Sequence, residues 1–137
     1  MRLTFTNLSL VFSAGALGGL INSLGVWTFG IIGIPQALGV KLAPALSGPW
    51  LYQRLVWGGL WGLLFLLPLK KLTYPWRGLV YSLAPTLGQL FVVFPYQAQK
   101  GVMGLQLGYL TPGFVIFYNA VWGLAAGLWL HLAMDKE

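Results

Sequence analysis

The feature that most constrains this chain is a series of four long apolar segments separated by short polar interruptions. The segments cover residues 8–34, 50–69, 78–98 and 113–134. Each is long enough to form a helix that crosses the hydrocarbon core of a bilayer, which takes about 20 residues. Charged residues make up only 7% of the chain, whereas soluble domains contain about a quarter. The sequence therefore predicts an all-α integral membrane protein, in which residues 1–137 form one domain of four transmembrane helices.

The distribution of Lys and Arg predicts how the helices are oriented. Four crossings would place both termini and the middle connection on one side, with Arg2, Lys70, Lys71, Arg77 and Lys136. The other side would hold Lys41, Arg54 and Lys100. Because basic residues gather on the cytoplasmic side, we expect both termini in the cytoplasm and the protein in a bacterial inner membrane. The middle connection, with Lys70, Lys71 and Arg77, is expected to face anionic lipid headgroups. Nucleic acid is not an expected partner.

A short phrase occurs twice in the sequence. VWGGLWG at 56–62 returns as VWGLAAG at 121–127, an offset of 65 residues. An offset of 63 pairs SLG at 23–25 with TLG at 86–88, so the two halves match if the intervening loops differ by two residues. The pattern predicts two tandem parallel repeats, 8–69 and 78–134, each of two helices and related by an axis along the membrane normal. Chance matching of the frequent Leu, Gly and Trp is the alternative for the first half of each repeat.

The connections at 35–49 and 99–112 are also matched and unusually apolar. They are too short to span a bilayer. They are expected either to lie in the membrane interface as brief helices or to re-enter the bundle. We favour the interfacial interpretation, because a re-entrant backbone is tolerated only where protein or water satisfies it.

Small residues recur at helical spacing in three of the four segments. The candidate packing positions are Gly15, Gly18, Gly19, Gly58, Gly62, Gly123 and Gly127. Such stripes let helix backbones approach closely, which is how helices associate in lipid, where there is no hydrophobic driving force between them. These glycines are therefore predicted to form helix-packing faces.

Polar residues inside the apolar segments form the candidate site. Arg54 and Asn119 are separated by the offset of 65, Gln53 precedes Arg54, and Asn22 and Gln89 lie deeper in their segments. We expect them to converge on a polar, anion-binding or lipid-binding site. Arg54 has three open interpretations: snorkelling to a lipid phosphate, structural hydrogen bonding, or binding of an anion. Since the only acidic residues are Asp135 and Glu137, no carboxylate within the predicted helices can neutralise Arg54.

The small number of reactive side chains also restricts the possible functions. There is no Cys and no buried carboxylate pair, and the single His131 cannot build a metal site. His131 is expected at headgroup level, with a pigment or haem ligand as the weaker alternative. No catalytic residue, metal or cofactor is predicted. The expected function is that of a non-enzymatic oligomeric or accessory subunit of a membrane complex; the alternative is a small channel or transporter for a neutral or anionic solute or lipid.

Overall fold

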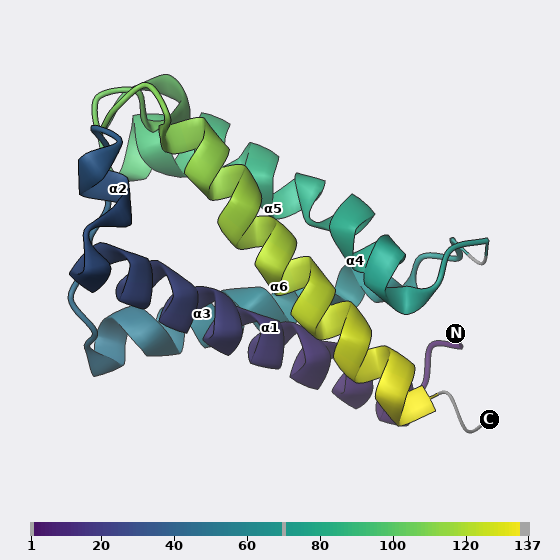
Figure 1. Cartoon of the computed structure of the whole chain (residues 1–137). Helices are drawn as coiled ribbons and strands as arrows, with labels where there is room; N and C mark the ends of the chain where they lie inside the picture. The colour runs from purple at the N-terminus through teal and green to yellow at the C-terminus, as the bar shows by residue number, and fades with distance from the viewer. Residues whose placement is uncertain (1, 70, 135–137) are drawn as a thin grey trace.

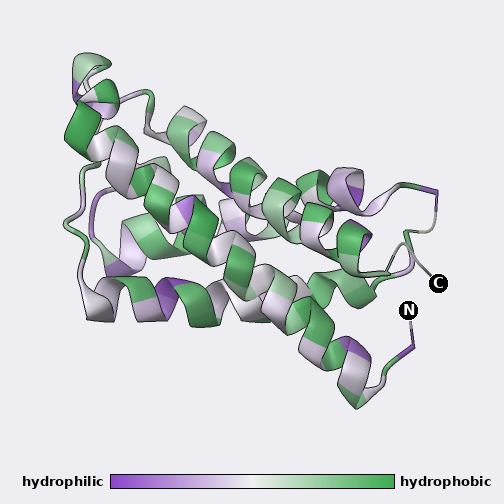
Figure 2. Ribbon diagram, turned by 60° about the horizontal axis from the view of Figure 1, so that its bottom comes forward, coloured by the Kyte–Doolittle hydropathy of each residue, from purple (hydrophilic) through white to green (hydrophobic). Residues whose placement is uncertain are grey.

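The computed structural model describes residues 2–69 and 71–134, and these contain helices and no strand. The elements in chain order are α1 (Phe5–Ile32), α2 (Ile34–Ala37), α3 (Gly48–Trp61), η1 (Gly62–Leu66), α4 (Tyr74–Tyr81), α5 (Leu83–Gly88), η2 (Gln89–Gln97), η3 (Val102–Gly104) and α6 (Thr111–Met134). Three stretches are long and apolar enough to cross a membrane: Phe5–Ile32, Tyr74–Gln97 and Thr111–Met134. Hydrophobic residues dominate every helix, and strongly hydrophilic positions inside helices are few (Figure 2). The chain is thus an all-helical protein of membrane type.

Local sequence signals set the helix boundaries. Thr4 caps α1 by accepting a hydrogen bond from the backbone N–H of Asn7, and Gly33 ends that helix at a positive φ of 96°. Ser47 caps α3 in the same way, through the backbone N–H of Trp50. Side-chain caps of this kind satisfy N–H groups that have no partner within the helix. Each predicted apolar segment therefore becomes helical within a few residues of its expected start.

The second apolar segment differs most from the expectation. It forms α3, of 14 residues, followed by η1, a 3₁₀ helix of 5 residues that ends at Leu66, before Pro68. Neither part alone has the length of a membrane-crossing helix. Proline lacks a backbone N–H and clashes with the preceding turn, so a helix usually stops ahead of it.

The third segment is helical but irregular. It divides into α4, α5 and η2, and η2 is a π-helix that contains Pro95. The division between α4 and α5 falls at Ser82, in the turn before Pro85. Each proline removes one hydrogen bond from the helical ladder. Pro85 and Pro95 therefore interrupt the regular hydrogen bonding of this segment.

Glycines hold two antiparallel helix pairs in backbone contact. In the pair α1–α3, Gly58 packs on Gly15 and Gly19, and Gly62 packs on the backbone of Val11. In the pair α4–α6, Gly78 packs on Gly123, and Gly127 packs on the backbone of Tyr74 and Pro75. A Cβ at any of these glycines would collide with backbone atoms of the opposite helix. The predicted glycine faces are therefore used for packing inside this chain.

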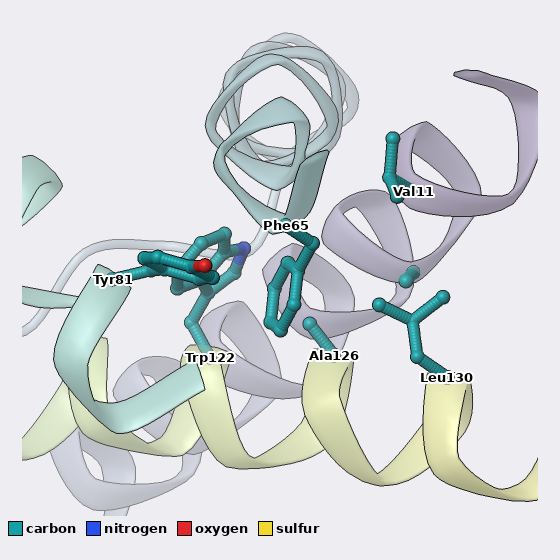
Figure 3. Close-up of a cluster of buried hydrophobic side chains, with 7 residues drawn as sticks. Val11, Phe65, Tyr81, Trp122, Ala126 and Leu130 are labelled. Atoms are coloured by element: carbon teal, nitrogen blue, oxygen red, sulfur yellow. The ribbon is translucent and has the colours of Figure 1, made fainter. Parts of the chain in front are cut away.

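The two pairs join through α1 and α6. A Cβ at Gly18 would collide with Trp122, whose indole N–H donates to the carbonyl of Gly15 at 3.0 Å. Beside this contact lies a buried cluster formed by Val11, Ala14, Phe65, Tyr81, Trp122, Ala126 and Leu130 (Figure 3). The cluster draws on α1, η1, α4 and α6. It fixes the end of the bundle where the chain begins and where α6 ends.

The opposite end of the bundle carries the two apolar connections. The start of α1, the end of α6 and the connection between η1 and α4 lie at one end, whereas α2 and the connections around 38–47 and 98–110 lie at the other (Figure 1). The two connections touch each other, because the backbone N–H of Lys41 donates to the carbonyl of Leu107 at 2.9 Å. Val40 is fully buried and packs in a cluster with Val26, Phe114 and Tyr118. These connections therefore cover the end of the bundle, and we call this end the loop end.

One basic residue lies where the sequence did not predict it. Arg77 is part of α4 and is buried, with 7% of its surface exposed, so it does not belong to a solvated middle connection. Its guanidinium donates to the carbonyls of Phe65 and Leu67 at 2.9 and 2.7 Å. These carbonyls lie where η1 stops, and the end of a helix leaves such acceptors without helical partners. Arg77 thus closes the end of η1, while Lys71 is exposed as expected and Lys70 lies outside the described residues.

Candidate polar pocket

A pocket of about 180 Å³ lies near the loop end of the bundle. Its polar lining consists of Asn22 from α1, Arg54 from α3, Gln89 from η2 and Asn119 from α6. Its remaining lining consists of the largely apolar side chains of Val26, Leu42, Pro44, Trp50, Phe94 and Tyr118. Four residues that the sequence singled out therefore meet in one place. We call this the polar pocket.

Arg54 forms the charged side of the polar pocket. Its Nε–H donates to Ser23 Oγ at 2.8 Å, and Nη2 donates to Asn22 Oδ1 at 2.5 Å. The guanidinium carbon lies 4.8 Å from the centre of the Trp50 ring, a position that favours a cation through the ring quadrupole. Ser23 Oγ in turn donates to the carbonyl of Gly19 at 2.6 Å. The guanidinium is thus held in place by its neighbours, and only part of its donor capacity is used, since it carries five N–H groups.

Asn22 also ties the charged side to α6. Its Nδ2 donates to the carbonyl of Tyr118 at 2.5 Å. The amide therefore accepts from Arg54 and donates to α6 at the same time. A side chain with both groups engaged is rotationally fixed, so Asn22 positions Arg54 relative to the second helix pair.

Gln89 and Asn119 form a neutral side of the polar pocket. Asn119 Nδ2 donates to Thr86 Oγ1 at 3.1 Å and to Gln89 Oε1 at 3.4 Å. Thr86 Oγ1 donates to the carbonyl of Ser82 at 2.7 Å. Within the described part of the chain, the NH₂ group of Gln89 has no protein partner. The neutral side therefore presents a hydrogen-bond donor that the protein leaves unused.

Tyr118 contributes another unused polar group. The residue lines the polar pocket and is 4% exposed. Its hydroxyl is buried and makes no hydrogen bond to the described residues. An unsatisfied buried polar group is costly and calls for an explanation. An acceptor supplied by a bound molecule is one such explanation.

The polar pocket contains a positive charge without an internal counter-ion. No Asp or Glu occurs in residues 2–69 and 71–134. The two acidic residues of the chain follow Met134, the last residue of α6, and Met134 lies 15 residues beyond Asn119. At 1.5 Å per helical residue this separation is about 22 Å. The environment of Arg54 therefore favours an anion that comes from outside the described chain.

The remaining candidate residues lie apart from the polar pocket. Gln53 is exposed on the outer face of α3. His131 is half-buried in the last turn of α6, and is about 18 Å along that helix from Asn119. No group of three His, Cys, Asp or Glu side chains suited to a metal occurs in the described ranges. The site that the structure assembles is thus the one built around Arg54.

Sequence reasoning missed several residues of this site. Ser23 and Thr86 hold Arg54 and Asn119 in place, and they are the first residues of the paired SLG and TLG motifs. The motif match therefore contained the signal, although it indicated a repeat and not a hydrogen bond. Leu42 and Pro44 carried no signal, because a connection can be placed over a site only by the tertiary fold.

Comparison with protein-family models, curated protein sequences and solved structures gives no match to this chain. The class that the fold and the polar pocket define is an all-helical protein with membrane-type helices and a buried, positively charged polar site.

Proposed function

We propose that this protein is a multi-pass membrane protein that binds the anionic group of a lipid or a small solute in the polar pocket, as part of its transport or handling. The observation that carries the proposal is Arg54 held in a pocket without a carboxylate partner among the described residues. Ionised groups inside membrane proteins are costly and mark functional sites by default. No covalent chemistry is required, so the proposed role is not enzymatic.

The proposed architecture is a bundle of four helices made from two tandem repeats, with α3 and η1 together forming the fourth crossing. Support comes from contacts that recur at the two sequence offsets. The hydrogen bond from Arg54 to Ser23 corresponds to that from Asn119 to Thr86, at offsets of 65 and 63. The contact of Gly58 with Gly15 corresponds to that of Gly123 with Gly78 at the same two offsets. Equivalent partners in both pairs support a repeat over chance similarity of composition.

The proposed orientation keeps both termini in the cytoplasm of a bacterial cell. The termini share one end of the bundle (Figure 1), and basic residues favour the cytoplasmic side. In this orientation the polar pocket lies in the outer half of the membrane. It would be reached from the outer leaflet or from the external solution.

A second candidate is the role of an oligomeric or accessory subunit, and one residue favours it. Trp57 is 60% exposed on α3, whereas Trp122, at the equivalent position 65 residues later, is 3% exposed and packs between helices. A partner helix covering Trp57 would bury it as Trp122 is buried, and the two equivalent tryptophans would then have similar environments. The glycine faces do not favour this candidate, because they already pack within the chain.

Native mass spectrometry of the protein gently extracted with its lipids and partners tests both candidates. We expect the wild type to retain an anionic lipid or small anion and Arg54→Gln to lose it. Lys100→Gln is the matched control, since it removes the same charge from an exposed site near the loop end. Equal retention by Arg54→Gln and the wild type would refute anion binding. Foreign subunits at fixed stoichiometry, released by Trp57→Ala, would favour the accessory role instead.

A further inference from the structure

The two sides of the polar pocket differ in charge although they are built on similar helix pairs. Arg54 and Asn119 occupy corresponding positions. Arg54 is held by the hydroxyl of Ser23 in α1, and Asn119 by the hydroxyl of Thr86 in α5, the helix that follows α4. Val26 and Gln89, separated by 63 residues, also both line the pocket. The side formed by α1 and α3 is therefore positive, whereas the side formed by η2 and α6 is neutral.

The donors that remain unused lie on both sides. On the positive side, two of the five N–H groups of Arg54 are engaged by Asn22 and Ser23. On the neutral side, the NH₂ group of Gln89 has no partner among the described residues. Tyr118, which also lines the pocket, has a buried hydroxyl with no partner there. Both sides thus provide hydrogen-bond donors for an acceptor on a ligand, and only the side with Arg54 carries a positive charge.

We propose that the polar pocket is specific for a ligand that carries two different hydrogen-bond acceptors. One is an anionic oxygen group bound by Arg54, and the other is a neutral oxygen, such as a hydroxyl or ester carbonyl, bound by Gln89 and Tyr118. This inference rests on the proposed function and specifies its ligand class. A hydroxy acid and the phosphate and ester region of a phospholipid both have this chemistry.

The volume of the pocket limits how much of the ligand it holds. Its 180 Å³ equals about six times the roughly 30 Å³ that a water molecule occupies in the liquid. A short hydroxy acid fits entirely. A phospholipid would place only its phosphate and adjoining ester inside, with its acyl chains outside the pocket.

Paired soluble probes test the neutral side. We would measure binding of butyrate and 3-hydroxybutyrate to the whole protein in phosphatidylcholine nanodiscs by calorimetry. One additional neutral hydrogen bond corresponds to about 5-fold in affinity, so 3-hydroxybutyrate should bind the wild type about 5-fold more tightly than butyrate. Gln89→Leu and Tyr118→Phe should each lower this ratio towards one, and Lys100→Gln should leave it unchanged.

Tyr118→Phe also separates a binding role from a structural one. Its hydroxyl has no partner in the described protein, so its removal should leave the unfolding temperature unchanged or raise it, because an unsatisfied group disappears. Loss of hydroxy-acid preference with retained stability supports the proposal. A ratio near one in the wild type, or an unchanged ratio in both variants, overturns it.

The source of the anion is distinguished by repeating the titrations with phosphatidylglycerol in the nanodiscs. Competition by phosphatidylglycerol identifies a lipid phosphate as an occupant of the pocket, and undiminished binding identifies a soluble anion; both agree with the proposed ligand class. Equal binding of the two acids, lost in Arg54→Gln, overturns the specificity while leaving the proposed function intact. Failure of the wild type to bind either acid or phosphatidylglycerol overturns both.

Discussion

Replacement of Gly58 by Ala should separate α3 from α1 and destabilise the protein. A Cβ at Gly58 would lie 2.7 Å from the carbonyl oxygen of Gly15 and 3.1 Å from the Cα of Gly19, whereas ordinary contacts begin at 3.4 Å. Both neighbours are backbone atoms of α1, so no side-chain rotation relieves the collision. The helices must instead move apart by several tenths of an ångström along a contact made entirely of backbone.

The size of the effect follows from two opposing contributions. Overpacking a well-packed interface costs about 1–3 kcal/mol, and Ala in place of Gly stabilises a helix interior by about 0.8–1 kcal/mol. We therefore expect Gly58→Ala to lower the free energy of unfolding by up to about 2 kcal/mol. Arg54 lies one turn earlier and its carbonyl packs against Gly19, so the same displacement should loosen the hydrogen bond between Arg54 and Ser23.

Gly25→Ala is the matched control for this change. Gly25 lies in α1, the helix against which Gly58 packs, but a Cβ there would meet no atom within 4 Å. Only the helix-propensity gain remains, so this variant should be as stable as the wild type or slightly more stable. Unfolding by sodium dodecyl sulfate in mixed micelles, followed by far-ultraviolet circular dichroism, measures both variants. Equal stability of Gly58→Ala and Gly25→Ala would refute the assignment of Gly58 to a close backbone contact.

Two further substitutions test other contacts in the same unfolding assay. Arg77→Met should destabilise the protein by about 1.5–3 kcal/mol, because it removes charge-assisted hydrogen bonds from one buried and one partly buried carbonyl at the end of η1. Lys71→Met, on the exposed connection, should have little effect, and equal losses would contradict the role of Arg77. Trp122→Phe keeps an aromatic ring but deletes the hydrogen bond to Gly15, so we expect a loss of about 0.5–1.5 kcal/mol. Trp57→Phe should be neutral, since Trp57 is exposed, and a comparable loss there would show that the indole hydrogen bond is not the cause.

Much of the helical content could be predicted from the sequence because apolar length alone sets it. The segment predicted at 113–134 became Thr111–Met134, and the segment predicted at 8–34 became Phe5–Ile32. Spacing also identified glycines that pack against another helix. It did not identify which helix, because a stripe of small residues fits a partner in the same chain as well as one in another chain.

The errors arose where position in the sequence was a poor guide to burial. Arg77 follows a basic connection and precedes an apolar segment, so composition places it at the surface. Its burial results from the early end of η1, which leaves carbonyls that need a donor. Gln53 was included because it adjoins Arg54, yet adjacent residues on a helix point about 100° apart, and Gln53 is exposed. In both cases the burial of the residue depends on its neighbours in the tertiary fold, and a single sequence does not reveal them.

The location of the polar pocket follows from how side-chain size is distributed along the helices. In the middle of α1 the residues that meet other helices are Gly15, Gly18 and Gly19, and nearer the loop end they are larger side chains such as Asn22, Val26 and Phe29. In the direction of the loop end, α1 and α6 are thus separated by aromatic contacts, such as that of Phe29 with Tyr118, whose ring centres lie 5.7 Å apart.

This gradient makes the two helix pairs diverge, and Figure 1 shows the helices closer together at the end with the termini than at the loop end. Backbone contact brings the two helix pairs together at one end, and the polar pocket lies towards the other, where Arg54 and Asn119 project from the second helix of each pair. A substitution that forces the helices apart at the glycine contacts should therefore alter the polar pocket as well as the stability of the protein. Reduced anion binding by Gly58→Ala, about one helical turn from Arg54, would be the expected sign of that coupling, and unchanged binding in a destabilised variant would show that packing and pocket are independent.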